Sequence, residues 1–235
     1  AEVPRVYVPL SLERMPLKFR SGVQLPEVPP HYTLLRQLWQ WGFREVVFVE
    51  PGSETILRIP HLLDEFQGRH QGQRCFVVGN GPSLNQIDMS RLKGEITLGS
   101  NRCFLGYGQW GFPFTYWGVY DTYQIEEYHP VYEQCVPEET VKFFPSAYLP
   151  LLSLEEGCPI DCSWPDPLRR DFSDDPGRVY RGFTVTYMLL QIAAIMGCDP
   201  IILIGADHRY ELSRRGYSRL LRSTRRGLAR RLRGG

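Results

Sequence analysis

The stretch Cys75-Phe76-Val77-Val78-Gly79-Asn80-Gly81-Pro82-Ser83-Leu84 carries the clearest structural signal in the chain. Its first four residues favour a buried strand, and Gly-Asn-Gly-Pro-Ser after them favours a tight turn into a helix. The glycines permit positive φ and a close approach of a ligand, and proline suits the first turn of a helix whose free N–H groups attract anions. The stretch therefore predicts a phosphate cradle to which Ser83 adds a hydroxyl. The alternative is a plain Gly-Pro turn between a core strand and a helix.

The glycine pattern differs from that of ordinary dinucleotide-binding folds. The turn has the first two glycines of the Gly-x-Gly-x-x-Gly fingerprint, but Leu84 stands in place of the third. This departure weakens the case for a nicotinamide cofactor.

Length and composition describe an ordinary globular protein. The chain has 235 residues, of which 43% are hydrophobic and 23% are charged, as is typical of soluble domains. We expect an N-terminal extension or subdomain over 1–58, a main domain over 59–211, and a basic, amphipathic C-terminal helix over 212–235. The fold class expected for the middle segment is α/β, a mostly parallel sheet with helices on both faces.

The cysteines and the first residues of the chain bear on its compartment. Cys75 and Cys198 lie in apolar runs where a reduced thiol packs as a small hydrophobe. Residues 1–10 lack a basic region followed by an apolar one, so no signal peptide is expected. The sequence thus predicts a cytoplasmic protein. The one close cysteine pair, Cys158 and Cys162, is expected in a loop rather than in a zinc site.

The net charge of +1 hides an asymmetry between the C-terminal tail and the rest of the chain. Residues 212–235 carry nine arginines and no acidic residue, which leaves 18 basic and 26 acidic residues in 1–211. Leucines interleave with the arginines at spacings that give a helix one mostly apolar side. Such a helix suits an anionic membrane surface at the inner face of the membrane, with nucleic acid as the weaker alternative. A solvated end is the remaining alternative.

Hydrophobic patterns place the other elements. Helices are expected over 32–41, 59–69, 88–92 and 182–196, and strands over 45–50, 95–100, 114–120, 141–144 and 200–207. The last of these strands reads as fully buried. The Pro-, Asp- and Ser-rich stretch 145–176 has little periodicity and is expected to be a long loop that lies over the site as a lid.

Polar residues follow the expected strands, at the edge where parallel sheets bind ligands. Ser100, Asn101 and Arg102 end the second strand of the domain, where amide and hydroxyl groups suit a ribose or a base and the arginine suits a phosphate. A solvated turn is the alternative. Asp121 follows the third strand, where it suits a hydroxyl or Mg²⁺, or else caps the next helix.

Two further positions at this edge are chemically informative. Thr184 or Thr186 is expected to cap the helix 182–196. Asp207 ends the last strand and is followed by His208 and Tyr210.

Taken in order, these segments resemble a known family. The turn 79–84 with Ile87-Asp88, the run Gly99-Ser100-Asn101-Arg102, the helix Thr184–Gly197 and the run Ile204-Gly205-Ala206-Asp207 look like the 6-hydroxymethylpterin diphosphokinase MptE-like family. That family is similar to the family 42 sialyltransferases, which share the Asn-Gly-Pro-Ser-Leu turn. The resemblance covers roughly residues 60–211.

The resemblance implies a Rossmann-like domain that binds a nucleotide and transfers a group from it. In the sialyltransferases the donor is a CMP-sugar and no metal is needed, whereas in the pterin enzymes ATP and Mg²⁺ supply a diphosphate. A tyrosine just past the Gly-x-Asp motif helps the sialyltransferases to bind the donor phosphate, and Tyr210 is its counterpart, one residue further from the aspartate. Residues expected to contact the nucleotide are Gly79, Asn80, Gly81, Ser83, Ser100, Asn101, Arg102, Asp121, Thr184 and Tyr210.

This chain lacks one feature of the sialyltransferases. They place a catalytic histidine some way after that motif, but the 25 residues after Tyr210 contain no histidine. Three explanations stay open: the catalytic segment lies beyond Gly235, another residue is the base, or the domain binds a nucleotide without turnover. Asp207 and His208 are the candidates for another base.

The sequence leads to three functional hypotheses. The first is a transferase that moves a sialic-acid-like sugar from a CMP-sugar to a glycan or protein hydroxyl, with Ser83, Arg102 and Tyr210 stabilising the departing phosphate. The second is diphosphate transfer from ATP to a small-molecule acceptor, a hydroxymethylpterin, with Asp121 and Asp207 near Mg²⁺. The third is a non-catalytic nucleotide-binding module. No tightly bound cofactor is expected in any of them.

Overall fold

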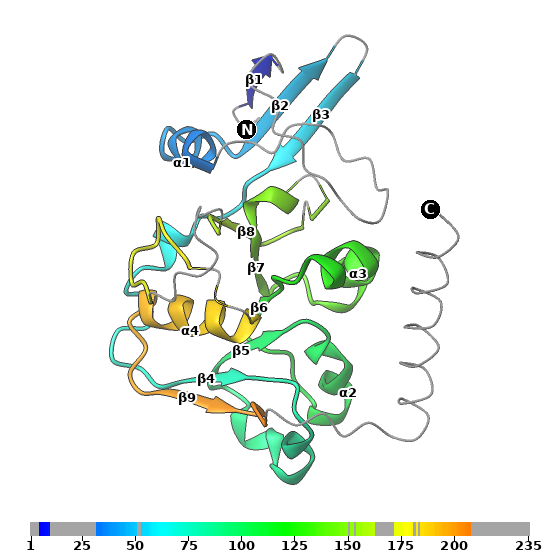
Figure 1. The fold of residues 1–235 in the computed structure, drawn as a ribbon, viewed down its shortest axis with the longest axis vertical. Helices are drawn as coiled ribbons and strands as arrows, with labels where there is room; N and C mark the ends of the chain where they lie inside the picture. The colour runs from blue at the N-terminus through cyan, green and yellow to red at the C-terminus, as the bar shows by residue number, and fades with distance from the viewer. Residues whose placement is uncertain are drawn as a thin grey trace, which may run out of the picture.

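The computed structural model describes residues 5–9, 32–50, 53–149, 151–152, 154–162, 172–180, 182 and 184–207. These residues form two β-sheets, one of three strands and one of six, which lie one above the other in Figure 1. The six-stranded sheet carries the segments that the sequence singled out.

The three-stranded sheet and one helix make up the first part of the chain. β1 (Arg5–Pro9) pairs in parallel with β2 (Glu45–Glu50), which forms an antiparallel hairpin with β3 (Ser53–Arg58). The helix α1 (Tyr32–Gln40) lies between β1 and β2 in the chain. The sequence predicted α1 and β2 but missed β1 and β3.

The helix α1 is attached to the larger part of the protein. Leu35 and Leu38 belong to the same buried cluster as Leu62 and as Val78 and Trp117 of the six-stranded sheet. Arg36 donates through Nε to Asp64 Oδ1 at 3.0 Å. The first part of the chain therefore shares a core with the six-stranded sheet.

The six-stranded sheet is entirely parallel. Its strands are β4 (Cys75–Val78), β5 (Ile96–Ser100), β6 (Tyr116–Gly118), β7 (Val141–Pro145), β8 (Gly157–Ile160) and β9 (Ile201–Ile204). Their spatial order is β8-β7-β6-β5-β4-β9, and every neighbouring pair is parallel. This sheet confirms the expected α/β, Rossmann-like fold.

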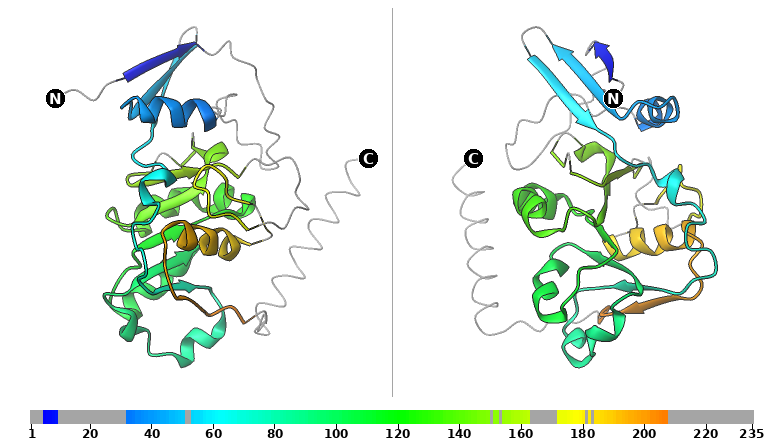
Figure 2. Two further views of the ribbon diagram at one scale, coloured as in Figure 1. Left: turned by 90° about the vertical axis from the view of Figure 1, so that its left-hand side faces the viewer. Right: turned by 180° about the vertical axis from the view of Figure 1, so that it is seen from behind.

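The direction of the connections places helices on both faces. From β4 to β8 the chain moves one strand at a time in one direction, and it then returns across the sheet to β9 through α4 (Val185–Ile195). Because crossovers between parallel strands are right-handed, the two directions put their connecting segments on opposite faces. Accordingly α2 (Tyr107–Trp110) and α3 (Thr122–Cys135) lie on one side of the sheet and α4 lies on the other (Figures 1 and 2). Short 3₁₀ helices complete the connections: η1 (Leu63–Phe66), η2 (Pro82–Gln86), η3 (Met89–Leu92), η4 (Cys103–Gly106) and η5 (Ser146–Tyr148).

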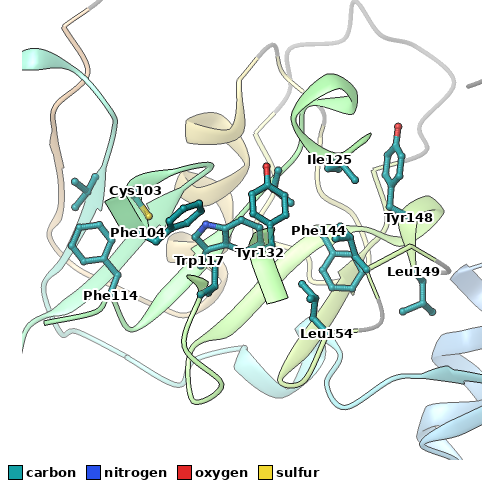
Figure 3. Close-up of a cluster of buried hydrophobic side chains, with 14 of the residues drawn as sticks. Cys103, Phe104, Phe114, Trp117, Ile125, Tyr132, Phe144, Tyr148, Leu149 and Leu154 are labelled. Carbon is teal, nitrogen blue, oxygen red and sulfur yellow. The ribbon is translucent and has the colours of Figure 1, made fainter. Parts of the chain in front are cut away.

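Each face of the sheet has its own core. Successive strand residues point to opposite faces, so Val77 joins the cluster under α4, whereas Val78 joins the cluster on the side of α3. Trp117 and Tyr132 are fully buried in the cluster on the side of α3, with their ring centroids 4.7 Å apart. Figure 3 shows them among other aromatic side chains. This aromatic core supports the ends of β5 and β6.

Several predicted elements are confirmed. The strands expected over 95–100, 114–120 and 141–144 correspond to β5, β6 and β7, although β6 is shorter than the expected strand. The helix expected over 88–92 is η3, and Asp88 caps it by accepting a hydrogen bond from the Ser90 amide at 3.2 Å. The helix expected over 182–196 is α4.

The prediction of an amphipathic helix over 59–69 is wrong. Only one turn, η1, forms there. Leu62 and Leu63 are both fully buried, but Leu62 belongs to the cluster on one face of the sheet and Leu63 to the cluster on the other. A helix buries one continuous stripe, so a segment that passes between two cores does not stay helical.

The prediction of one long loop over 145–176 is also wrong, because the strand β8 lies within this stretch. Cys158 is therefore part of a strand rather than a loop. Ile160 is the only β-branched residue of Gly-Cys-Pro-Ile, which has no aromatic residue, so the strand signal is weak; a proline is tolerated at the edge of a sheet. Residues 163–171 of the expected lid lie outside the described residues.

The strand that reads as fully buried is only partly so. β9 begins at Ile201, and Leu203 within it is 44% exposed. The reason is topological: among the described strands, β9 lies at one end of the sheet. Four aliphatic residues in a row do not distinguish an edge strand from a central one.

Candidate functional site

The carboxyl ends of the six parallel strands form one edge of the sheet, and the strand order reverses at β4. This strand lies between β5, which follows it in the chain, and β9, the last strand described. Open parallel sheets bind ligands at such a switch point. The turns after β4, β5 and β9 therefore lie where the sequence predicts a nucleotide.

The corner between β4 and β9 is filled by the protein itself. The Gly79 amide donates to the carbonyl of Ile204, and the Gly81 amide donates to that of Gly205, both at 2.8 Å. A Cβ on Gly79 would lie 2.8 Å from the carbonyl carbon of Gly205, and one on Gly81 would lie 2.6 Å from Cγ of Asp207. The two turns interlock, so a ligand has no space between them.

The reason for glycine at positions 79 and 81 therefore differs from the expected one. Gly81 has a φ of −76°, and Gly79 is not among the glycines with positive φ. Positive φ falls instead on Gly205, at 65°, where a Cβ would lie 2.7 Å from Cδ2 of Leu84. The two glycines are needed because the backbone after β9 comes close to them.

The helix expected after Pro82 is the short 3₁₀ helix η2, and a carboxylate of the same chain binds its first residues. The Ser83 amide donates to Oδ2 of Asp207 at 2.7 Å, and the Ser83 hydroxyl donates to Oδ1 of Asp207. The anion at this amide is therefore the protein's own side chain.

Asn80 faces the other way, towards β5. Its Nδ2 atom donates to the carbonyl oxygen of Ser100 at 3.2 Å and to Oγ of Ser100 at 3.1 Å. Ser100 is 1% exposed, whereas Asn80 is exposed. These bonds tie the turn after β4 to the end of β5.

Asn101 has the most unusual environment at this edge. Its φ of 51° is left-handed, a conformation that few residues other than glycine and asparagine adopt readily. Its amide donates to the Gly118 carbonyl at 3.0 Å, and its carbonyl accepts from Nε1 of Trp117 at 2.8 Å. Its side-chain Oδ1 is buried and has no hydrogen-bond partner among the described residues. A buried acceptor of this kind calls for an explanation.

Arg102 follows β5 and Asp121 follows β6, and the charges of both act on Tyr132. The guanidinium of Arg102 lies over the ring of Tyr128, 4.8 Å from its centroid. Burial raises the pKa of Tyr132, while the nearby charges of Arg102 and Asp121 respectively lower and raise it. Asp121 accepts a hydrogen bond from the Gln124 amide at 3.0 Å, which confirms its expected alternative role as the cap of α3.

Thr184 caps α4 at the same edge of the sheet. Its side-chain oxygen accepts a hydrogen bond from the Tyr187 amide at 3.2 Å, so of the two expected caps the structure selects Thr184. The other end of α4 contacts the segment that leads into β4, where the Gly68 amide donates to the Ile195 carbonyl at 2.9 Å. The helix thus runs opposite to the strands, and its N-terminus reaches their carboxyl ends.

The remaining candidates fall elsewhere. His208 and Tyr210 lie outside the described residues, so their roles as base and phosphate ligand stay predictions. Among the described residues, no group of three or more His, Cys, Asp and Glu side chains could hold a metal ion. Mg²⁺ near Asp121 and Asp207 stays a prediction too.

Sequence reasoning missed two residues that shape this edge. Trp117 is fully buried and fixes the carbonyl of Asn101, and Tyr128 lies under Arg102. An aromatic residue near the end of a predicted strand was a signal for Trp117. Nothing in the sequence marks Tyr128, because its partner lies far away along the chain.

Comparisons with known proteins give a distant structural likeness. No protein-family model matches the chain, and no curated protein matches it. A solved structure that does match is that of the MAf glycosyltransferase from Magnetospirillum magneticum AMB-1, at 16% identity and a TM-score of 0.47. The match covers 63% of this chain and 25% of that chain, so this chain spans a quarter of its length. At this TM-score the likeness carries no argument about activity.

The helices of the described residues are short. None of them combines the length and the apolar character needed to cross a bilayer.

Proposed function

We propose that this protein is a nucleotide-dependent transferase whose donor lies over the carboxyl ends of β4, β5 and β6. The observation that carries the proposal is Asn101, which combines a left-handed backbone with a buried Oδ1 that no described residue satisfies. Strained backbone and unsatisfied buried polar atoms both cost free energy, and they are found preferentially at functional sites. A hydroxyl or amino group of a bound donor would supply the missing hydrogen bond.

The groups around Asn101 suit different parts of a nucleotide. Asn80 is exposed and offers an amide group that suits a ribose or a base edge, and the buried Ser100 holds its Nδ2 atom. Arg102 is exposed and offers a cation to a phosphate. Thr184 lies at the N-terminus of α4, whose amide groups favour negative charge.

The donor we propose is a CMP-sugar, from which a sialic-acid-like sugar passes to a hydroxyl of a glycan or protein. This narrower assignment rests on the resemblance of four segments of the sequence to the family 42 sialyltransferases. It agrees with the neutral Ser100 and Asn101 at the end of β5, where dinucleotide-binding folds place an acid against the ribose.

Thermal unfolding with added nucleotides tests this proposal. CMP and a CMP-sugar should raise the Tm without Mg²⁺, because a ligand at about 100 times its Kd stabilises a folded protein by about 2.7 kcal/mol. A rise with ATP that requires Mg²⁺, and none with CMP, would favour diphosphate transfer to a pterin instead. No rise with CMP, a CMP-sugar, ATP or GTP would overturn the nucleotide site itself.

We also propose that residues 212–235, outside the described residues, bind an anionic membrane surface. The nine arginines and interleaved leucines of this segment support the proposal. The full chain should sediment with vesicles that contain phosphatidylserine and not with phosphatidylcholine vesicles, and a chain ending at 211 should stay in solution with both. Equal sedimentation of the two chains would contradict the proposal.

A further inference from the structure

We propose that Asp207 is a positioning residue, which holds the turn after β4 so that Asn80 reaches Ser100. It is then neither a general base nor a metal ligand. The inference rests on the proposed nucleotide site for its effect on binding, and on the contacts of the turn for everything else.

Both oxygens of the Asp207 carboxylate bind the same residue across the corner. Oδ2 accepts the Ser83 amide at 2.7 Å, and Oδ1 accepts the Ser83 hydroxyl. Hydrogen bonds to a charged acceptor are stronger than neutral ones. The side chain therefore fixes the position and the orientation of Ser83 relative to β9.

The same carboxylate lies directly against Gly81. A Cβ on Gly81 would come within 2.6 Å of Cγ and 2.7 Å of Oδ2 of Asp207. The Gly81 amide also donates to the Gly205 carbonyl at 2.8 Å. Two residues of the turn, Gly81 and Ser83, are thus held from the side of β9.

Asn80 lies between residues that are held in this way. The Gly79 amide on its other side donates to the Ile204 carbonyl at 2.8 Å. Asn80 itself is exposed, so packing does not fix its side chain, yet its Nδ2 meets Ser100 at 3.1 Å and 3.2 Å. The orientation of Asn80 therefore depends on its neighbours, and Asp207 acts on the site through them.

The chemistry of Asp207 allows position and charge to be separated. In Asp207→Asn, the amide oxygen still accepts the Ser83 N–H, and the amide nitrogen can donate to the Ser83 hydroxyl oxygen. The turn keeps its two contacts while the negative charge is lost. An amide cannot accept a proton as a base does, so a catalytic role predicts that Asn at this position slows group transfer as much as Ala does, whereas a positioning role predicts that Asn keeps CMP binding and Ala weakens it.

The binding experiment compares four full-length proteins with CMP as the probe: wild type, D207N, D207A and N80A. D207N should bind within about threefold of wild type, and D207A and N80A should each bind at least about tenfold more weakly. The double variant D207A/N80A should bind no more weakly than either single variant, because both changes act on one group. Equal losses for D207N and D207A, or no loss for D207A, would overturn the inference.

A second readout needs no nucleotide and separates this inference from the proposed function. The side-chain amide of Asn80 gives an NMR signal that reports its bonds to Ser100. That signal should move in D207A and stay in place in D207N. If D207A does not fold, Ser83→Ala removes one of the two contacts and should produce a smaller movement in the same direction. An Asn80 signal that stays in place in the folded variant would overturn the inference whether or not CMP binds.

Discussion

The two corners beside β4 differ in what fills them. Towards β9, the turn 79–83 meets protein: backbone hydrogen bonds join it to Ile204 and Gly205, and Asp207 binds Ser83. Towards β5, Asn80 of the same turn binds Ser100, and the next residue along the chain is Asn101, whose buried Oδ1 no described residue satisfies. A turn that reads as a phosphate cradle is thus closed on one side and unsatisfied on the other.

The contacts of the turn divide residue by residue between its two sides. Gly79, Gly81 and Ser83 are odd-numbered and face β9, whereas Asn80 faces β5. The glycines of the motif serve the packing of two strands, and the asparagine between them serves the polar edge. One short motif therefore performs a structural task and a candidate binding task at the same time.

The largest expected effect is the loss of stability when the aromatic residue that supports Asn101 is removed. Trp117→Ala removes a fully buried ring and the donor to the Asn101 carbonyl, so it should lower the free energy of unfolding by about 3–5 kcal/mol. Trp41, which is 65% exposed, offers the matched control: Trp41→Ala should change it by no more than about 0.5 kcal/mol. Urea unfolding measures both, and similar losses would show that the polar edge does not depend on this core.

The next effect tests the closed side. Gly81→Ala places a Cβ within 2.6 Å of Asp207, so it should cost about 1–3 kcal/mol of stability. A Cβ added to Gly108, within α2, would have no other atom within 4 Å, and Gly108→Ala should be neutral or stabilising by up to about 1 kcal/mol. If chemical denaturation shows Gly81→Ala to be harmless, the corner has space and a ligand could enter it.

A smaller effect separates the backbone of Asn101 from its side chain. Asn101→Ala keeps the left-handed φ of 51° with a residue that disfavours it, at a cost of about 1 kcal/mol. Asn101→Gly relieves this strain, so it should be at least as stable as wild type. Guanidinium unfolding of the pair measures the difference, and equal stability of the Ala and Gly variants would show that the backbone at this position is not strained.

The smallest effect lies at the opposite, amino edge of the sheet. Burial lowers the pKa of His70, with a hydrogen bond to Gln73 opposing and the charge of Arg69 assisting. As the pH falls, the unfolded chain, with a histidine pKa of about 6.5, takes up a proton before the folded one does. The contribution of neutral His70 to the free energy of unfolding is therefore present above about pH 6.5 and is lost as the pH falls below it.

The His70→Gln variant provides the control for that pH dependence. Wild type should lose more stability than the variant between about pH 7.5 and about pH 5.5, a range that spans the titration of an ordinary histidine, and CMP affinity should change equally in both. A pH effect on CMP affinity that disappears in His70→Gln would show that titration of His70 at the amino edge affects binding at the carboxyl edge. It would contradict the expectation that the two edges act independently.

How much of this could be read from the sequence depends on the distance between partners. The strands β4, β5 and β7 followed from local pattern, and η3 and α4 followed from local pattern together with their caps Asp88 and Thr184, because strand and helix signals lie within a few neighbouring residues. The tight packing at Gly81 did not, because its partner Asp207 lies at the far end of the domain. The sequence identified the glycine but could not show what surrounds it.

Buried polar groups were equally hidden. Lys142 stands in β7 and is 2% exposed, with Nζ donating to the carbonyls of Glu138, Thr140 and Glu155 at 2.8–3.1 Å. A lysine between apolar residues reads as one exposed position of a strand. Only the fold shows that three carbonyl groups surround it. The candidate site follows the same rule, since its residue types were predicted and their partners were not.

The proposed site requires that the donor binds on the β5 side of the turn and not in the corner with β9. Isothermal titration of CMP into Asn101→Gly and Ser83→Ala distinguishes these two locations. We predict that Asn101→Gly binds at least about tenfold more weakly than wild type and that Ser83→Ala stays within about threefold. A large loss for Ser83→Ala with unchanged binding for Asn101→Gly would instead place the donor in the corner that the structure shows as filled, and the proposed site would be wrong.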